Sequence, residues 1–343
     1  MRWELELMKS FFSDHQSSHT PARELQNGAL VPHAESQARV DAILDVLPDR
    51  QSPMDFGESP ILAVHDSGYV DFLKRAHKDW VAAGRPGDAF PYVFPIRGRR
   101  PLNLNRIDAE LGQYCYDCGT PVAAGTWTAV YWNAQTALTG LDAVLDGAKR
   151  VFAFCRPPGH HAGRDYMGGY SYLNNVAIAV EQARKSGASK VAVLDVDYHH
   201  GNGTQDIFYT RSDVLTVSLH ADPATDYPFY WGHADEAGEG RGNGYNLNLP
   251  MPRGTKWPAY RAKLVEAIEQ VQAFAPDLLI VPYGADTYAG DPISFFDIET
   301  ADYTTMSSLI AALDLPTLIC MEGGYAVDAL GANVQAFLRG FEA

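Results

Sequence analysis

One stretch of ten residues, 195–204, concentrates groups that bind metals in proteins. It reads Asp-Val-Asp-Tyr-His-His-Gly-Asn-Gly-Thr and directly follows the apolar run Val191–Leu194. Side chains alternate between the two faces of a strand, so Asp195, Asp197 and His199 should point the same way. Carboxylate oxygens and imidazole nitrogens are ligands of borderline metals such as Zn²⁺. The stretch therefore predicts part of a metal site, the alternative being a solvated turn after a strand.

The elements that must position this stretch alternate between strand and helix. Apolar runs predict strands at 9–13, 150–155, 191–194, 214–219, 278–283 and 316–321. Helical spacing of apolar residues predicts helices at 126–147, 175–184, 258–275, 303–313 and 327–341. Buried strands that alternate with helices indicate an α/β fold, with a mostly parallel central sheet and helices on both faces.

Polar residues follow five of these predicted strands. They include His160 and His161, the opening stretch, Asp222, Asp286 and Tyr325. In open α/β sheets the ligand crevice lies beyond the carboxyl ends of the strands. We therefore expect one site assembled from five strand ends.

Asp197, His199 and Asp286 are the best candidates for three metal ligands. Such a set leaves positions open for water and substrate, and a cation held in this way lowers the pKa of water and polarises a carbonyl. The alternative for Asp286 alone is a cap at a strand end. His200 falls on the opposite face by alternation, and we expect a structural role for it.

The adjacent His160 and His161 suggest a general base and a partner imidazole. Each needs an orienting group on its other ring nitrogen, and Asp195 is available to His160 and Asn202 to His161. Because a carboxylate raises imidazole basicity and an amide does not, the two histidines should titrate differently. The alternative is a structural or solvent-facing pair. Tyr325 follows two glycines, a turn that can place a phenol near an oxyanion, although alone it also fits a plain surface turn.

Composition narrows the classes of function. The 343 residues carry a formal net charge of −15, which argues against nucleic acid as a partner and is compatible with a cationic substrate. No apolar run reaches the roughly 18–20 residues of a membrane span, and the N-terminus lacks the pattern of a signal peptide, so we expect a cytoplasmic protein and no membrane partner. The pair Cys115 and Cys118 has C-x-x-C spacing, but no second ligand pair is evident.

We expect a single catalytic domain over residues 1–343, with residues 1–7 as an N-terminal extension. The stretch 85–120 is rich in proline, glycine and arginine and predicts a long loop insertion. Its aromatic residues indicate an ordered excursion that packs on another surface, such as a second subunit.

Six motifs, taken together, carry a resemblance to a known family. They are Arg156-Pro-Pro-Gly-His-His-Ala, Gly168-Gly-Tyr-Ser-Tyr-Leu-Asn-Asn, the opening stretch, Ser218-Leu-His, Gly284-Ala-Asp-Thr-Tyr-Ala-Gly-Asp-Pro and Glu322-Gly-Gly-Tyr. In this order they resemble the histone deacetylase superfamily from about Val64 to the C-terminus. Within it the chain looks most like bacterial acetylpolyamine amidohydrolases, because of the Pro-Gly-His-His form, Asn202 in Gly-Asn-Gly-Thr-Gln, the run Asp-Pro-Ile-Ser-Phe-Phe at 291–296 and the long loop before Cys115.

The resemblance implies an arginase-like three-layer fold and zinc-dependent amide hydrolysis. It assigns Zn²⁺, one ion per active site, to Asp197, His199 and Asp286. His161 would be the general base and His160 an electrostatic partner or acid. Tyr325 would hydrogen-bond the scissile carbonyl and then the oxyanion.

The resemblance also implies structural K⁺ ions and a substrate channel. One K⁺ would lie at Asp195, Asp197, His199, Ser218 and Leu219, and a second at Phe208, Arg211, Val214 and Tyr245. Tyr170 and Tyr227 would form channel walls beside Gly169, with Tyr where the family often has Phe. The acidic residue of many polyamine-specific relatives is replaced here by Gly119, so Asp108, Glu110 or Asp117 would supply the negative charge that binds the substrate amine.

The favoured function is hydrolysis of a small, cationic acetylated amine such as acetylputrescine or acetylcadaverine by a homodimer that uses the 85–120 loop. The nearest alternative is a deacetylase of acetyl-lysine in peptides or proteins. An arginase-type ureohydrolase with two Mn²⁺ would need bridging carboxylate motifs that are absent, and a catalytically silent binding protein would not need every catalytic position filled. Fe²⁺ or Co²⁺ could occupy the same ligands as Zn²⁺.

Overall fold

The structure is a computed structural model that describes residues 8–96, 102 and 104–342. The extension predicted at residues 1–7 lies outside the described residues. None of the described helices is both long and apolar enough to cross a membrane.

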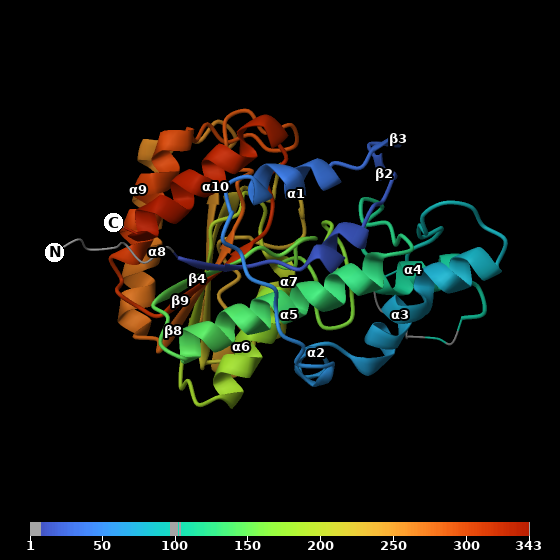
Figure 1. The fold of residues 1–343 in the computed structure, drawn as a ribbon, viewed down its shortest axis with the longest axis horizontal. Helices are drawn as coiled ribbons and strands as arrows, with labels where there is room; N and C mark the ends of the chain where they lie inside the picture. The colour runs from blue at the N-terminus through green and yellow to red at the C-terminus, as the bar shows by residue number, and fades with distance from the viewer. Residues whose placement is uncertain (1–7, 97–101, 103, 343) are drawn as a thin grey trace.

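A seven-stranded sheet with the strand order β1-β4-β9-β8-β5-β6-β7 forms the centre of the fold (Figure 1). Every neighbouring pair in it is parallel. The strands are β1 (Lys9–Phe11), β4 (Arg150–Ala153), β5 (Val191–Asp195), β6 (Val214–Ala221), β7 (Asn246–Met251), β8 (Leu278–Tyr283) and β9 (Thr317–Met321). The six predicted strands all belong to this sheet, and among its strands only the edge strand β7 was not predicted.

Helices cover both faces of this sheet. The helical elements are η1 (Asp14–Ser18), α1 (Gln37–Leu44), α2 (Ser59–Leu62), α3 (Ser67–Ala82), α4 (Ile107–Tyr114), α5 (Thr126–Leu145), α6 (Asn175–Lys185), α7 (Asn202–Phe208), η2 (Gly240–Gly242), α8 (Trp257–Phe274), α9 (Thr300–Ala311) and α10 (Val327–Glu342). The five predicted helices correspond to α5, α6, α8, α9 and α10. The predicted three-layer α/β class is confirmed.

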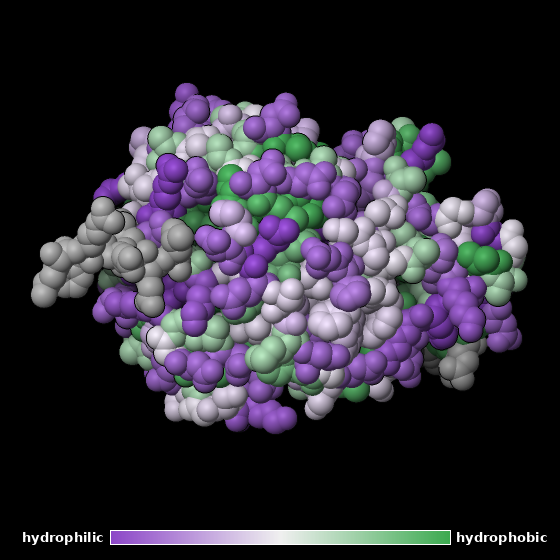
Figure 2. Space-filling view, viewed as in Figure 1, coloured by the Kyte–Doolittle hydropathy of each residue, from purple (hydrophilic) through white to green (hydrophobic). Residues whose placement is uncertain are grey.

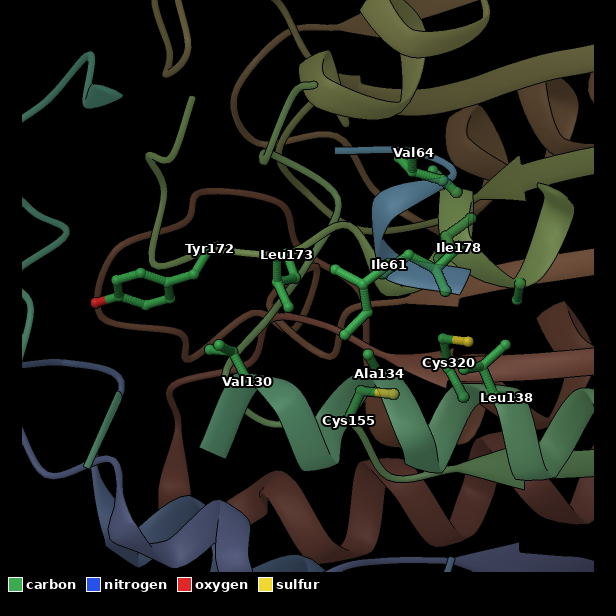
Figure 3. Close-up of a cluster of buried hydrophobic side chains, with 14 of the residues drawn as sticks. Ile61, Val64, Val130, Ala134, Leu138, Cys155, Tyr172, Leu173, Ile178 and Cys320 are labelled. Carbon is green, nitrogen blue, oxygen red and sulfur yellow. The ribbon is translucent and has the colours of Figure 1, made fainter. Parts of the chain in front are cut away.

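The core has two parts because side chains of the central strands alternate between the faces. On β9, Leu318 and Cys320 pack with α5 and α6, whereas Ile319 and Met321 pack with α8, α9 and α10. Figure 3 shows the first part, where Val130, Ala134 and Leu138 of α5 lie near Cys155, Ile178 and Cys320. The view of Figure 2 shows mainly hydrophilic residues at the surface, with apolar residues in separate patches.

The helices α1, α2, α3 and α7 were not predicted, and two further regions differ from the sequence interpretation. The stretch 85–120 was expected to be a loop, but it contains α4, whose Ile107 and Leu111 are buried. Helix formation there buries apolar side chains against the first core part, so residues 107–114 of the predicted insertion are helical. A hairpin of β2 (Arg23–Gln26) and β3 (Ala29–Pro32), which was not predicted, lies apart from the main sheet (Figure 1).

Candidate active site and metal centre

Asp197, His199 and Asp286 come together beyond the ends of β5 and β8. One ligand atom from each lies within 4.8 Å of the other two. His199 Nδ1 is 3.0 Å from Asp286 Oδ2, and both carboxylates are buried. The two strands are neighbours in the sheet, which is why residues 89 positions apart can share one site.

The chemistry of this group fits a divalent cation. Burial first, and then the charge of Asp197, raise the pKa of Asp286 to about 7, although the neighbouring His199 opposes this rise. Gly284 and Gly323 let the two carboxylates pack directly against the main chain, since a Cβ at either position would collide with them. Two carboxylates and one imidazole, with His199 lining a pocket, match a three-ligand site for a borderline metal.

The two histidines of the Pro-Pro-Gly-His-His turn lie beside this group. His160 Nδ1 is 2.9 Å from Asp195 Oδ2, and His161 Nδ1 is 2.7 Å from Asn202 Oδ1. These are the two orienting contacts expected from the sequence. Because the amide oxygen of Asn202 can only accept, His161 Nδ1 carries the hydrogen, and its Nε2 is the basic atom.

The environments of the two histidines push their pKa values apart. Burial lowers the pKa of His161, and the charges of His160 and His199 lower it further. Burial also opposes charge on His160, but the nearby Asp195, Asp197 and Glu322 raise its pKa to about 10. His161 is therefore suited to accept a proton and His160 to remain an imidazolium, as the carboxylate and amide partners indicate.

Tyr325 is held from its backbone and from its ring. Its N–H donates to Asp291 Oδ2 at 2.6 Å, and the Arg39 guanidinium lies 5.0 Å from the ring centroid. Arg39 also donates to the carbonyls of Glu322 and Gly324, each at 2.6 Å. Burial raises the pKa of Tyr325, so the phenol stays a hydrogen-bond donor. The plain surface turn is thereby excluded.

A cavity of about 260 Å³ leads to these groups. Its lining includes the predicted His161, Gly169, Tyr170, His199, Tyr227, Tyr325 and Asp117, together with Glu24–Asn27, Cys118, Gly119 and Ile293. The two predicted channel tyrosines thus lie in one pocket with the candidate base and phenol. Their hydroxyls are engaged, Tyr170 with Glu24 at 3.1 Å and Tyr227 with Asp117 at 2.8 Å.

The three acidic residues considered for amine binding lie in different places. Asp117 lines the pocket, but its carboxylate accepts from the N–H groups of Gly119 and Gly169 and from Tyr227, so it braces the wall. Asp108 and Glu110 lie on α4 and do not line this pocket.

Arginines already pair with both α4 carboxylates. Arg85 and Arg106 each donate to Asp108 at 2.7 Å, and Arg75 donates to Glu110 at 2.9 Å. This placement corrects the expectation that either residue contacts a substrate amine in this pocket, because both carboxylates serve to hold α4 in place.

Glu24 is the pocket carboxylate that sequence reasoning missed. It is 2% exposed, accepts from Tyr170, and its Oε2 has no hydrogen-bond partner among the described residues. Burial raises its pKa to about 7. A signal was present: Asn27-Gly28 between two short runs is typical of a hairpin turn, and both residues have positive φ here.

The residues suggested for K⁺ lie along β5, β6 and α7. Asp195 faces Ser218 across the β5–β6 ladder, and Leu219 follows. At the other end, the Phe208 carbonyl accepts from Arg211 N–H at 2.8 Å, the Tyr245 carbonyl accepts from Thr216 N–H at 3.0 Å, and Val214 begins β6. Potassium binding by these groups stays a prediction.

His200 is buried and points away from the pocket. Its Nε2 is 3.1 Å from Asn248 Oδ1, and its ring packs against His220 at 4.6 Å between centroids. These contacts agree with the structural role expected from strand alternation.

Comparisons with known proteins agree with this geometry. The chain is 47% identical to Acetylpolyamine amidohydrolase 2 of Pseudomonas aeruginosa over 98% of this chain and 99% of that protein. It is 42% identical to the Acetylpolyamine amidohydrolase of Mycoplana ramosa over 97% and 99%. The crystal structure of an acetylpolyamine aminohydrolase from Burkholderia pseudomallei superposes with a TM-score of 0.94 at 42% identity, covering 98% of this chain and 99% of that chain.

A profile of the histone deacetylase domain matches residues 33–341, a range that contains the metal-ligand group, both histidines and Tyr325. The resemblance expected from the sequence motifs is confirmed, and the chain belongs to the histone deacetylase domain family.

Proposed function

We propose that this protein is a metal-dependent deacetylase that hydrolyses the acetyl amide of small acetylated diamines and polyamines. Relatives that are 42–47% identical over nearly the whole chain are named acetylpolyamine amidohydrolases, which supports this reaction. The observation that carries the proposal is a single pocket with His161 and Tyr325 near the metal-ligand group and the partly unpartnered Glu24 carboxylate in its wall.

Asp197, His199 and Asp286 would hold one Zn²⁺ or a similar borderline cation. When bound, such a cation supplies Lewis acidity toward the acetyl carbonyl and makes water more acidic. We keep the two K⁺ sites as part of the proposal, with a structural role along β5 and β6.

The side chains divide the remaining work. His161 Nε2 takes a proton from the attacking water, while Asn202 holds the ring through Nδ1. The Tyr325 hydroxyl donates to the carbonyl oxygen, where negative charge develops as the water oxygen adds. The C–N bond then breaks, and an imidazolium of the histidine pair returns a proton to the leaving amine. Asp195 stabilises the imidazolium form of His160.

The pocket would select the rest of the substrate. Tyr170 and Tyr227 flank an aliphatic chain, and Glu24 receives the free ammonium group. We infer this role for Glu24 because it lines the pocket and its Oε2, which lies 3.9 Å from His33 Nε2, accepts no hydrogen bond among the described residues, whereas three protein donors already occupy the Asp117 carboxylate.

The assembly and location are also proposals. Tyr92, Val93, Phe94, Ile96 and Leu102 are exposed apolar residues of the 85–120 stretch, and we propose that a second copy of the chain covers them. All four cysteines are free thiols, which supports a reducing cytoplasmic location. We also propose that residues 1–343 form one catalytic domain.

The test is a substrate panel on protein of measured metal content. We expect kcat/KM for acetylputrescine or acetylcadaverine to exceed that for an acetyl-lysine peptide at least tenfold, and D286N to be inactive. A preference for the peptide would favour the lysine deacetylase. Two metal ions per site with ureohydrolase activity would favour the arginase-type reaction. Lack of hydrolysis of any acetylated amine by the metal-loaded protein would favour a silent binding protein.

A further inference from the structure

Glu322 is a fully buried carboxylate at the end of β9, and the proposed chemistry uses it only through its charge, which helps to raise the pKa of His160. Its Oε2 accepts hydrogen bonds from the N–H groups of Gly159 at 2.6 Å and His160 at 3.1 Å. Its Oε1 has no hydrogen-bond partner in the described part of the chain. The bonds of this side chain therefore converge on the turn that carries the two histidines.

The main chain of Glu322 begins the segment 322–325, which ends at Tyr325. The Glu322 carbonyl accepts from Arg39 Nη2 at 2.6 Å, and the next N–H, that of Gly323, donates to Asp197 Oδ2 at 2.8 Å. The Glu322 N–H donates to the Tyr283 carbonyl at 2.8 Å, which anchors the residue to β8. One residue thus bonds the histidine turn with its side chain and begins the tyrosine segment with its backbone.

We propose that Glu322 is a positioning residue that fixes the His160–His161 turn relative to Tyr325. The base and the phenol come from different strands, and without a direct link each segment could shift separately. Hydrogen bonds from N–H groups to a buried carboxylate are about twice as strong as bonds between neutral groups, so they suit such a link. Displacement of a reacting group by about 1 Å can cost on the order of 100-fold in rate.

Packing alone is the competing explanation. No arginine or lysine forms an ion pair with the Glu322 carboxylate among the residues that the structure describes; Arg39 reaches only its backbone carbonyl, and the charge of His160 lowers the pKa of the carboxyl group. Burial raises the pKa of Glu322 to about 7, while His160 and the hydrogen bonds from Gly159 and His160 favour the charged form. A role in packing would be met by an apolar side chain of the same length.

The test uses E322Q and E322M, which are close to glutamate in size. This inference rests on the proposed deacetylase activity, so wild-type turnover of an acetylated diamine is measured first, and its absence counts against the proposed function alone. We expect kcat to fall about 5-fold in E322Q, which keeps a weaker acceptor, and on the order of 100-fold in E322M, with KM within about threefold of wild type.

N133A is the matched control, because Asn133 Nδ2 donates to the Pro157 carbonyl at 2.6 Å and so braces the same turn without touching the tyrosine segment. A double-mutant cycle with Y325F separates the two explanations. If Glu322 positions the histidine turn relative to Tyr325, the fold-decrease in kcat of the E322M/Y325F double mutant is smaller than the product of the two single fold-decreases. For N133A and Y325F, the fold-decrease of the double mutant equals that product.

A folded E322M with kcat within threefold of wild type would overturn the proposal, as would multiplicative losses in the E322M cycle or a change confined to KM. Should E322M fail to fold, the cycle of E322Q with Y325F replaces it. The proposal would then be overturned by a kcat of E322Q equal to that of wild type, or by a double-mutant decrease in kcat equal to the product of the two single decreases.

Discussion

The clearest consequence of the pocket concerns Glu24→Gln. Glutamine keeps the size of the side chain and can still accept from the Tyr170 hydroxyl, so the wall should hold its shape. What is lost is the negative charge of a side chain that lines the pocket. A substrate with a free ammonium group should therefore bind more weakly, whereas an uncharged analogue such as N-butylacetamide should not.

The magnitude follows from burial. Glu24 is 2% exposed, so water screens its interaction with a bound ammonium group only weakly. A hydrogen bond to a charged group in such a place contributes about 1.5–3 kcal/mol. This corresponds to a rise in KM for acetylputrescine of about 10- to 150-fold, with kcat nearly unchanged.

The same carboxylate predicts a pH dependence with a definite sign. Burial, as the largest cause, raises the pKa of Glu24 to about 7, so the group is neutral below that pH and charged above it. The ratio of kcat/KM for acetylputrescine to that for N-butylacetamide should rise with pH through about 7 in the wild type. The ratio cancels titrations that affect both substrates, and it should be flat in E24Q.

The assay is steady-state kinetics on both substrates with E24Q, D117N and E110Q. E110Q is the matched control, since Glu110 pairs with Arg75 outside the pocket and should leave both substrates unaffected. D117N should weaken both substrates alike, because it disturbs the wall. Equal KM values for acetylputrescine in E24Q and the wild type would refute the assignment of Glu24.

Three further outcomes follow from the site. Y325F should lower kcat by about 10²–10³ with little change in KM, because it removes one donor to the oxyanion; near-normal turnover would remove Tyr325 from the mechanism. N202D should move the acid limb of the kcat/KM profile to higher pH, since a carboxylate beside Nδ1 raises the pKa of His161; an unmoved limb would show that His161 is not the titrating base. Removal of metal by a chelator should abolish activity and lower Tm by roughly 6 °C. Metal at a concentration of about 1,000 Kd stabilises the folded protein by about 4 kcal/mol. Dividing this free energy by the unfolding entropy, about 2.1 cal/mol/K for each of 343 residues, gives the shift in Tm. An unchanged Tm in calorimetry would contradict a tight site at the Asp197 group.

The central sheet could be predicted because its signal is local. Strands such as β5 and β9 are continuous apolar runs, and the polar residues that follow them must meet at one edge of a parallel sheet. That rule alone brings Asp197 and Asp286 together. Helix α3 was missed although its buried Tyr69, Leu73, Ala76 and Trp80 follow helical spacing after the N-cap Asp66, so the information was present and unused.

The pocket wall could not be derived in this way. Leu25 N–H donates to the Cys118 carbonyl at 3.2 Å, and this contact sets the β2–β3 hairpin beside residues that lie more than 90 positions later. The pattern of apolar and polar residues in the two segments does not indicate that they pair. The carboxylate that we propose in place of the missing acid at Gly119 therefore comes from a part of the chain that the sequence motifs did not indicate.

This difference has a consequence for specificity. The catalytic groups sit on the ends of buried strands, where a change of position would disrupt the core. Glu24, Leu25 and Asn27 line the same pocket from an exposed hairpin that makes no ladder with the main sheet. The hairpin can change in sequence without disturbing the metal-ligand group, so the choice of substrate can vary while the chemistry stays fixed. For this chain, a buried acid on that hairpin favours a substrate whose far end carries a positive charge.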